Sequence, residues 1–195
     1  MGYKCMSLKT VKLEVTEIIS SKAFADCCNL TKVLLPKTLR KIDSKAFRRC
    51  KELQEVEISN SVWEIGGAAF AECFMLNSLK ISKGVASVKK GLCDGCYSVD
   101  NIEIPEGCEV IGKNTFRGCA WLKSINIPQL VKVIEASFEN CTRLVGVKFK
   151  GEPQFIAKNC FKDCNDDLTF VVISGSITSV VTVVDKVDEI DLIVE

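Results

Sequence analysis

A phenylalanine followed three residues later by a cysteine recurs along the chain at a nearly constant interval. The phenylalanines of its six copies are Phe24, Phe47, Phe70, Phe116, Phe138 and Phe161. Successive copies are 23, 23, 46, 22 and 23 residues apart, so the double interval predicts a further copy at residue 93. The stretch CDGC (93–96) lies there, with Cys93 in the phenylalanine position. Such a period is typical of a solenoid, because one unit cannot bury its own apolar face and has to stack on its neighbours.

Each unit carries a second apolar signature after its cysteine. Two apolar residues alternate with polar ones, as Val33 and Leu35 do, which predicts a short strand with one buried face. Prolines such as Pro36 end three of these strands, because proline has no N–H to donate to a ladder. A further apolar residue precedes each phenylalanine position by five residues: Ile19, Ile42, Ile65, Val88, Ile111, Val133 and Ile156. The unit predicts one parallel strand per repeat, joined by short helical or irregular turns that hold the phenylalanine and the cysteine on their inner side.

The repeat pattern extends close to both ends of the chain. LKTVKL (8–13) and LTFVVI (168–173) fit the strand pattern, and Ile177 and Val180 are expected in the next apolar positions. VDEIDL (187–192) fits the strand spacing again, although the unit there has lost its phenylalanine and cysteine. We therefore predict a single solenoid over residues 1–195, with eight to nine rungs, of which those over 168–195 are degenerate. An amphipathic helix over 180–194 is the alternative for the last part.

The composition narrows the functional classes. Apolar residues make up 47% of the 195 residues, and the net charge of +1 is too close to neutral to indicate binding to nucleic acid or to an anionic membrane. The absence of histidine excludes Ser-His-Asp and Cys-His catalysis and Cys/His zinc sites within the chain. No apolar run of signal-peptide length is present near Met1, and acidic residues interrupt the Val-rich C-terminal segment. We expect no cofactor and no membrane insertion, and a cytoplasmic location unless an export signal has been removed, in which case the cell surface is expected.

The unit LPKTLRKIDSKAFRRCKELQEVEIS (35–59) resembles the BspA-like leucine-rich repeats, also called the Treponema pallidum type. The resemblance covers nearly the whole chain through its seven linked copies. It implies a curved α/β-type solenoid with one strand per repeat on the concave side. It also implies a binding module or a surface adhesin, because known members are mostly of these kinds, and it carries no catalytic residues.

The cysteines form a ladder within the repeat. Its seven members are Cys27, Cys50, Cys73, Cys96, Cys119, Cys141 and Cys164. Side chains in equivalent positions of stacked rungs point the same way, whereas a disulfide requires them to face each other, so small buried hydrophobic residues are the favoured interpretation. The alternative for Cys93 and Cys96 is a redox or zinc site, which would need a βαβ context or a second Cys-x-x-Cys. If Cys93 only replaces a phenylalanine, we expect its rung to be underpacked by about 1–3 kcal/mol.

The residues that alternate with the buried strand residues, all polar except one leucine, are the candidate ligand-binding surface, here called the strand face. Its members are Lys12, Lys32, Leu34, Glu55, Glu57, Ser78, Lys80, Asn101, Glu103, Ser124, Asn126 and Lys148. A solenoid presents many such side chains together, which favours recognition of a protein or peptide. The face is mixed in sign and has no aromatic residue, so an ordinary solvated surface is the competing interpretation.

These observations support three functional hypotheses. The first is a non-catalytic protein–protein interaction module that binds a protein or peptide ligand through the strand face. The second, implied by the resemblance alone, is a cell-surface adhesin or virulence-type binding protein. The third is a self-assembling solenoid, because the ends and the Val-rich C-terminal segment lack a polar cap and would favour homo-oligomers. An enzyme is not expected, since no acid/base constellation accompanies the absence of histidine.

Overall fold

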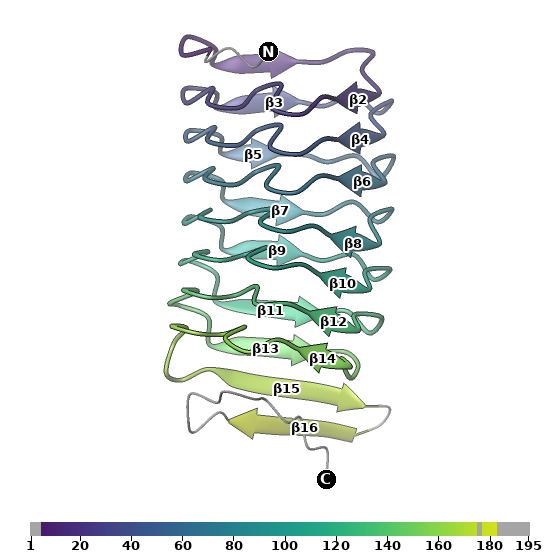
Figure 1. Cartoon of the computed structure of the whole chain (residues 1–195), viewed down its shortest axis with the longest axis vertical. Coiled ribbons are helices and arrows are strands. Elements are labelled where there is room, and N and C mark those ends of the chain that lie inside the picture. Colours follow the sequence, from purple (N-terminus) through teal and green to yellow (C-terminus); the bar gives the residue numbers. More distant parts are fainter. Residues whose placement is uncertain (1–4, 175–176, 183–195) are drawn as a thin grey trace.

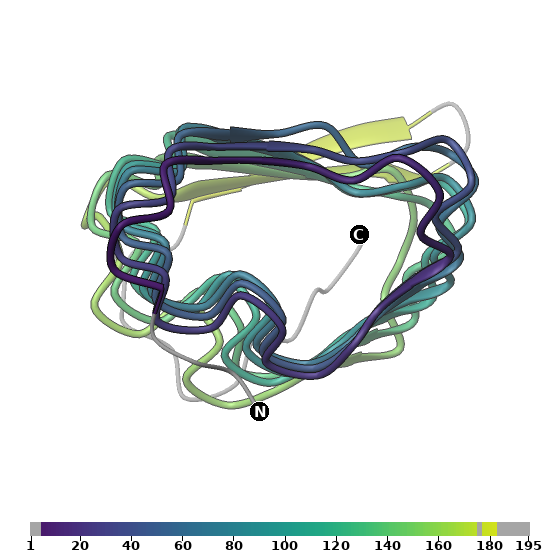
Figure 2. The ribbon, with the colours of Figure 1, turned by 90° about the horizontal axis from the view of Figure 1, so that it is seen from above.

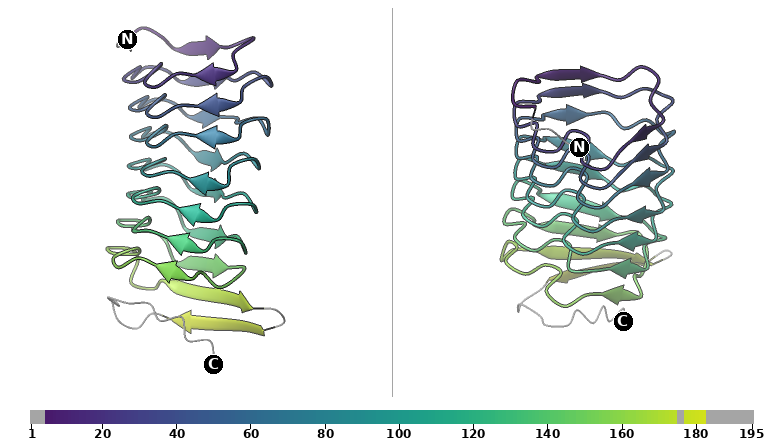
Figure 3. Two further views of the ribbon diagram at one scale, coloured as in Figure 1. Left: turned by 45° about the vertical axis from the view of Figure 1, so that its right-hand side comes forward. Right: turned by 45° about the horizontal axis from the view of Figure 1, so that its top comes forward.

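The structure is a computed structural model that describes residues 5–174 and 177–182. The chain winds into a parallel β-solenoid whose turns lie one above another (Figure 1). Seen along the stack, the turns superpose around one shared interior (Figure 2). Each of seven turns contributes two short strands, so the strands form two columns on different sides of that interior (Figure 3).

The two columns have different strand lengths. The first column consists of β1 (Thr10–Lys12), β3 (Lys32–Leu34), β5 (Glu55–Val56), β7 (Ser78–Lys80), β9 (Asn101–Glu103), β11 (Ser124–Ile127), β13 (Gly146–Phe149) and β15 (Thr169–Ser174). The second column consists of the two-residue strands β2 (Ile18–Ile19), β4 (Lys41–Ile42), β6 (Glu64–Ile65), β8 (Ser87–Val88), β10 (Val110–Ile111), β12 (Val133–Ile134) and β14 (Phe155–Ile156). The last strand, β16 (Ile177–Thr182), follows β15.

The prediction of a solenoid with parallel strands is confirmed, and the strands pair in the register of the repeat. Val11 lies beside Val33, and Val33 lies beside Val56. The structure adds the second column, which the prediction of one strand per repeat left out. No helix occurs among the described residues, so the predicted helical turns are irregular in this part of the chain.

The interior contains two stacks of phenylalanine rings, as the period predicts. Centroid distances are 5.3 Å for Phe24–Phe47 and 5.4 Å for Phe47–Phe70. In the second stack the centroid distances are 5.5 Å for Phe116–Phe138 and 5.3 Å for Phe138–Phe161. Three of these ring pairs are within 7° of parallel and Phe116–Phe138 is inclined by 30°; stacked pairs contribute roughly 0.5–1.5 kcal/mol beyond the area they bury. The rung between the two stacks is the one that carries Cys93.

Cys93 occupies the phenylalanine position and is fully buried, as the repeat predicts. The residue before this position is small in the other turns: Ala23, Ala46, Ala69, Thr115, Ser137 and Cys160. In this turn it is Leu92, which is also buried. The underpacking of this rung stays a prediction, and we infer that the larger Leu92 compensates for the smaller Cys93 because both side chains are buried.

One predicted core position is shifted by a residue. Ile134, and not Val133, pairs with Ile111 of the preceding turn and is buried, while Val133 is half-buried. This unit is one residue shorter than its neighbours, and the missing residue lies between Ile134 and Phe138. Because Val133 and Ile134 are both apolar, the sequence alone does not show which of the two is buried.

The C-terminal end of the array differs from the prediction. β16 pairs with β15 in antiparallel register, with Thr169 beside Thr182 and Ser174 beside Ile177. The expectation that Ile177 and Val180 continue the rung that begins at Leu168 is therefore wrong: the chain turns back and forms a hairpin at the edge of the first column. Residues 180–182 belong to this strand and not to a helix, while 187–192 and the rest of 180–194 lie outside the described residues.

Candidate binding surfaces

The strand face lies where the sequence predicts it, on the outward side of the first column. All its residues are exposed, whereas the strand residues between them, such as Val33 and Ile102, are buried. The parallel register aligns equivalent side chains of successive turns, so that Asn126 lies beside Lys148. Lys80 and Glu103 form an ion pair at 2.6 Å. The strand face is therefore an array of exposed side chains, polar apart from Leu34 and with charges of both signs, on a backbone that is fixed by the ladder.

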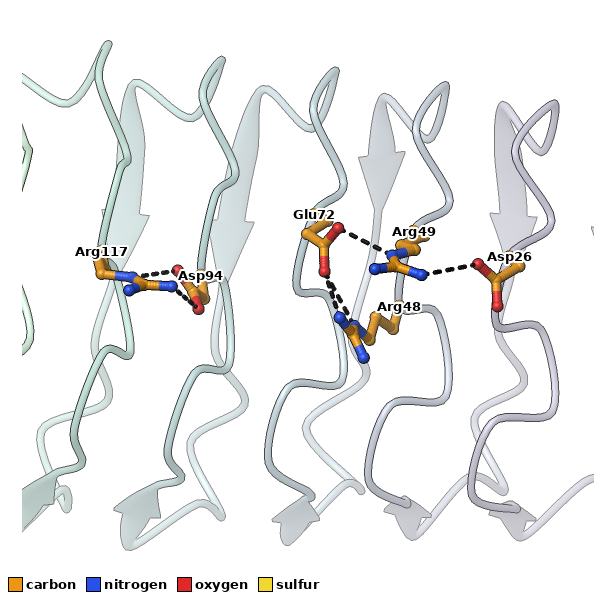
Figure 4. A network of polar contacts seen from close by, with 6 residues as sticks. All are labelled: Asp26, Arg48, Arg49, Glu72, Asp94 and Arg117. Carbon is orange, nitrogen blue, oxygen red and sulfur yellow. Dashed lines mark hydrogen bonds and ion pairs between the residues drawn. The ribbon is translucent and has the colours of Figure 1, made fainter.

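A second polar surface follows the turns that come after the phenylalanine positions, here called the turn edge (Figure 4). Glu72 accepts hydrogen bonds from Nε and Nη2 of Arg48 at 3.0 and 2.6 Å and from Nε of Arg49 at 2.9 Å. Arg49 also approaches Asp26 at 3.7 Å. Burial alone would raise the pKa of Glu72, but the two guanidinium groups outweigh it and hold this pKa below its usual value. These contacts link three successive turns.

The fourth and fifth turns are joined at the same edge by a two-pronged ion pair. Arg117 donates from Nε and Nη2 to the two carboxylate oxygens of Asp94 at 2.8 and 2.9 Å. This fork geometry is the strongest form of an arginine–carboxylate contact. Asp94, the second residue of the CDGC stretch, thus holds two turns together.

The remaining residues of CDGC also have structural roles. Gly95 has φ of +73°, and the equivalent residues of other turns, including Arg49 and Glu72, have positive φ as well. Each turn bends through a left-handed residue at this place, where glycine carries no steric penalty. Cys93 and Cys96 are fully buried, and burial raises the pKa of both thiols. A buried thiol with a raised pKa is a poor nucleophile, so the stretch has the character of a packed turn and not of a redox centre.

The cysteine ladder has a specific partner in each turn. The thiols of Cys50, Cys73, Cys96, Cys119, Cys141 and Cys164 donate to the carbonyl oxygen of the phenylalanine position one turn earlier, at 3.0–3.6 Å. Each of these carbonyls already accepts the N–H of the cysteine in its own turn, as Phe24 does from Cys27 at 3.2 Å. Cysteine is both small and a weak donor, which suits a second bond to a buried carbonyl.

The ladder has a further member that lies outside the phenylalanine–cysteine motif. The register of β1 with β3 places Cys5 in the position equivalent to Cys27, and the N–H of Leu8 bonds to Cys5 as that of Leu30 bonds to Cys27. No phenylalanine precedes Cys5 by three residues, so the phenylalanine–cysteine motif could not find it. Among the described residues, no three or more Cys, Asp or Glu gather in an arrangement that could hold a metal ion.

Three aromatic residues and a methionine, exposed except for the half-buried Phe74, gather at the corner that leads from the ladder to the first column. The positions directly after the ladder cysteines hold Phe74, Met75, Tyr97 and Trp121 in the third to fifth turns, and polar residues in most other turns. We call these four residues, with Lys51 and Arg143, the aromatic corner. Its sequence signal is the presence of large apolar side chains, in three successive turns, one or two residues after the ladder cysteine, where most other turns have polar residues.

A shallow pocket of about 390 Å³ lies beside the second column. Its lining consists of Trp63, Glu64, Gly84, Ala86, Ser87 and Lys89. Small residues in the turn after Trp63 leave one side of the exposed indole open. Glu64 is held by Lys41 at 3.3 Å, so the pocket offers mainly the apolar surface of Trp63.

Comparison with known proteins identifies the repeat. The model of the BspA-type leucine-rich repeat region matches residues 17–137 and 65–183. The chain belongs to the BspA-type leucine-rich repeat family. No curated protein matches this BspA-type chain.

Solved structures of leucine-rich repeat proteins resemble this BspA-type chain. The T. pallidum leucine-rich repeat protein is 31% identical, with a TM-score of 0.50, over 62% of this chain and 68% of its own. The pneumococcal vaccine antigen PcpA has the same fold at 14% identity and a TM-score of 0.59, over 86% of this chain and 63% of its own. A leucine-rich cell surface protein of Faecalibacterium prausnitzii is 22% identical, with a TM-score of 0.47, over 88% of this chain and 61% of its own. None of the described residues of this chain forms a helix long and apolar enough to cross a membrane.

Proposed function

We propose that the protein is a non-catalytic interaction module that binds a protein or peptide through the strand face. The observation that carries the proposal is the regular exposure of one polar side chain after another along the first column, on strands whose other side is buried. Membership of a leucine-rich repeat family supports a binding role.

The geometry of the strand face suits recognition of a surface and not of a small molecule. Its side chains alternate with the buried Val33, Leu79 and Ile125, so they stand on rigid strands. A backbone that is already fixed loses little conformational entropy on binding, which favours affinity. The strand face carries charges of both signs, and its negative charges include Glu55 and Glu57 on one turn. These charges would select a partner by electrostatic complementarity.

A charge-reversal experiment tests the proposal. The triple variant Glu55→Lys, Glu57→Lys, Glu103→Lys reverses three exposed charges on the strand face. A matched control, Glu17→Lys, Glu109→Lys, Glu152→Lys, changes the net charge equally with three exposed residues away from that face. Wild type and both variants are used in pull-downs from the native organism, with the partners identified by mass spectrometry.

The proposal predicts that partners retained by the wild type and by the control are lost with the strand-face variant. An unchanged set of partners on all three proteins would contradict it. Self-assembly remains a separate prediction, which a strictly monomeric mass by light scattering at tens of micromolar would exclude. An adhesin role is likewise a separate hypothesis, which an export signal upstream of Met1 in the full reading frame would favour.

A further inference from the structure

The aromatic corner is a second exposed surface that differs chemically from the strand face. Tyr97 and Trp121 are 51% and 54% exposed, and Met75 is 43% exposed. They lie on three successive turns, next to the ladder cysteines whose backbone is fixed by the interior. Tryptophan, tyrosine and arginine are the residues that most often dominate binding energy at protein interfaces.

The side chains of the corner hold one another in place. The rings of Phe74 and Tyr97 stack with a centroid distance of 5.1 Å and an interplanar angle of 21°. The guanidinium of Arg143 lies 4.4 Å from the ring of Trp121. The ammonium of Lys51 lies 5.7 Å from the ring of Phe74. Because these large side chains are already ordered, a partner would bury them at a small entropic cost.

The charge of the corner indicates what it would bind. Within the part of the chain that the structure describes, neither Lys51 nor Arg143 has a carboxylate at ion-pair distance, and each lies against a ring instead. The arginines of the turn edge, such as Arg117, are by contrast engaged by carboxylates. The edge of an aromatic ring is positively polarised, which also favours contact with a carboxylate.

Three acidic residues belong to the same region of the surface. Glu52, Asp100 and Asp166 are exposed, and Asp166 occupies the position of Arg143 in the next turn, so the corner is not uniformly basic. Among the described residues no ion pair joins any of the three to Lys51 or Arg143, so the two cations are available to an external carboxylate.

We propose that the aromatic corner binds an acidic segment of a partner protein, in which carboxylate side chains alternate with apolar ones. The carboxylates would pair with Lys51 and Arg143, and an apolar side chain would pack on Met75 and the ring edges of Tyr97 and Trp121. The inference rests on the proposed role as a protein-binding module, but it assigns a different surface and a defined partner chemistry.

A displayed library of random peptides, selected against the purified full chain, tests the inference. Selected peptides are then measured by fluorescence polarisation against wild type, Tyr97→Ala/Trp121→Ala, Arg143→Glu and the matched control Trp63→Ala. Trp63 is 56% exposed and lies away from the corner, so its variant controls for the loss of an exposed indole. Circular dichroism of each variant verifies that the fold is retained.

The inference predicts selected peptides enriched in Asp or Glu alternating with apolar residues. It further predicts affinities that fall at least about tenfold for the corner variants and stay unchanged for Trp63→Ala. Peptides without acidic enrichment, or peptides that bind the corner variants as well as wild type, would overturn it. A wild-type dimer that becomes monomeric in Tyr97→Ala/Trp121→Ala would also overturn it, because a second copy of the chain would then be the occupant.

The outcome is separable from that of the strand-face proposal. The strand-face triple variant is expected to bind the selected acidic peptides as wild type does. If it lost those peptides while the corner variants kept them, the strand face and not the corner would be the peptide site.

Discussion

The exchange of side-chain size between Leu92 and Cys93 predicts a pair of substitutions that are strongly non-additive. Leu92→Ala removes most of a side chain that is 1% exposed, and we expect a cost of about 2–5 kcal/mol. Cys93→Phe inserts a ring where Leu92 already fills part of the space, and we expect a cost of about 1–3 kcal/mol from overpacking. If the two substitutions acted independently, the double variant would therefore lose about 3–8 kcal/mol of its free energy of unfolding.

The double variant restores the Ala-Phe pair that the three preceding turns have. A ring at residue 93 would join the stack ending at Phe70 to the stack beginning at Phe116. The stacked pairs elsewhere have centroid distances of 5.3–5.5 Å. Each new stacked pair contributes about 0.5–1.5 kcal/mol. We expect the double variant to be within about 1 kcal/mol of wild type or more stable, with a coupling free energy of at least about 2 kcal/mol.

Urea denaturation followed by circular dichroism measures the free energy of unfolding of wild type, the two single variants and the double variant. An equal slope of the four transitions verifies that the same surface is exposed on unfolding. The converse variant Ala69→Leu/Phe70→Cys serves as a control, because it should reproduce the same compensation one turn earlier. A double variant Leu92→Ala/Cys93→Phe destabilised by the sum of its two single substitutions would refute the proposed exchange of volume.

Three further predictions follow from the turns. Gly95→Ala should destabilise the protein by about 1–2 kcal/mol, since φ is +73°, whereas Gly107→Ala, where an added Cβ meets nothing within 4 Å, should change stability by less than about 0.5 kcal/mol; equal thermal shifts would contradict this. The exposed thiol of Cys5 should react with Ellman's reagent at once and the thiols of 93–96 only as the protein unfolds, so a fast-reacting thiol there in the folded protein would reopen the redox interpretation. Because the pKa of Glu72 is lowered by folding, its contribution should be present near neutral pH and be lost as the pH falls below about 4; Glu72→Gln should cost about 0.5–1 kcal/mol at pH 7 and nothing at pH 2, and a pH-independent difference would count against the ion pairs.

The period of the phenylalanine–cysteine motif was enough to predict stacking, the buried positions and the outward positions of the first column. A solenoid brings residues one period apart into contact, so a residue such as Phe47 reports directly on Phe24 and Phe70. The same logic assigned Cys93 to the interior although it is not an aromatic residue. In such a fold, the repeat period in the sequence states which residues are in contact.

The second column escaped prediction because its strands are too short to carry an alternating pattern. β4 has two residues, of which only Ile42 points inward. A single apolar residue specifies a buried position but not a strand, since the strand exists only through its pairing with neighbouring turns.

The end of the array was mispredicted for a related reason. The valine- and isoleucine-rich sequence after Ser174 has strand propensity but no phenylalanine or cysteine to fix its direction. Antiparallel pairing satisfies the hydrogen bonds of β15 as well as another parallel turn would, and it needs only a short connection. Propensity therefore identified strand β16, and not its topology.

The aromatic corner could not be recognised from the period, because its members do not repeat. Phe74 and Tyr97 are one period apart, but Trp121 occupies the following position in its turn. Their proximity depends on the register of three turns together with the direction of each side chain. This solenoid departs from an ideal array at such positions, where the residue type changes from one turn to the next.

Carboxylate labelling of the protein bound to its partner tests the binding role of the strand face most directly. Carbodiimide-activated coupling of an amine modifies exposed carboxylates, and mass spectrometry compares the free and bound states. The account predicts that labelling of Glu55, Glu57 and Glu103 falls in the complex, while Glu17 and Glu109 near the second column are labelled as before. Protection of Glu17 and Glu109 with unchanged labelling at the strand face would contradict it.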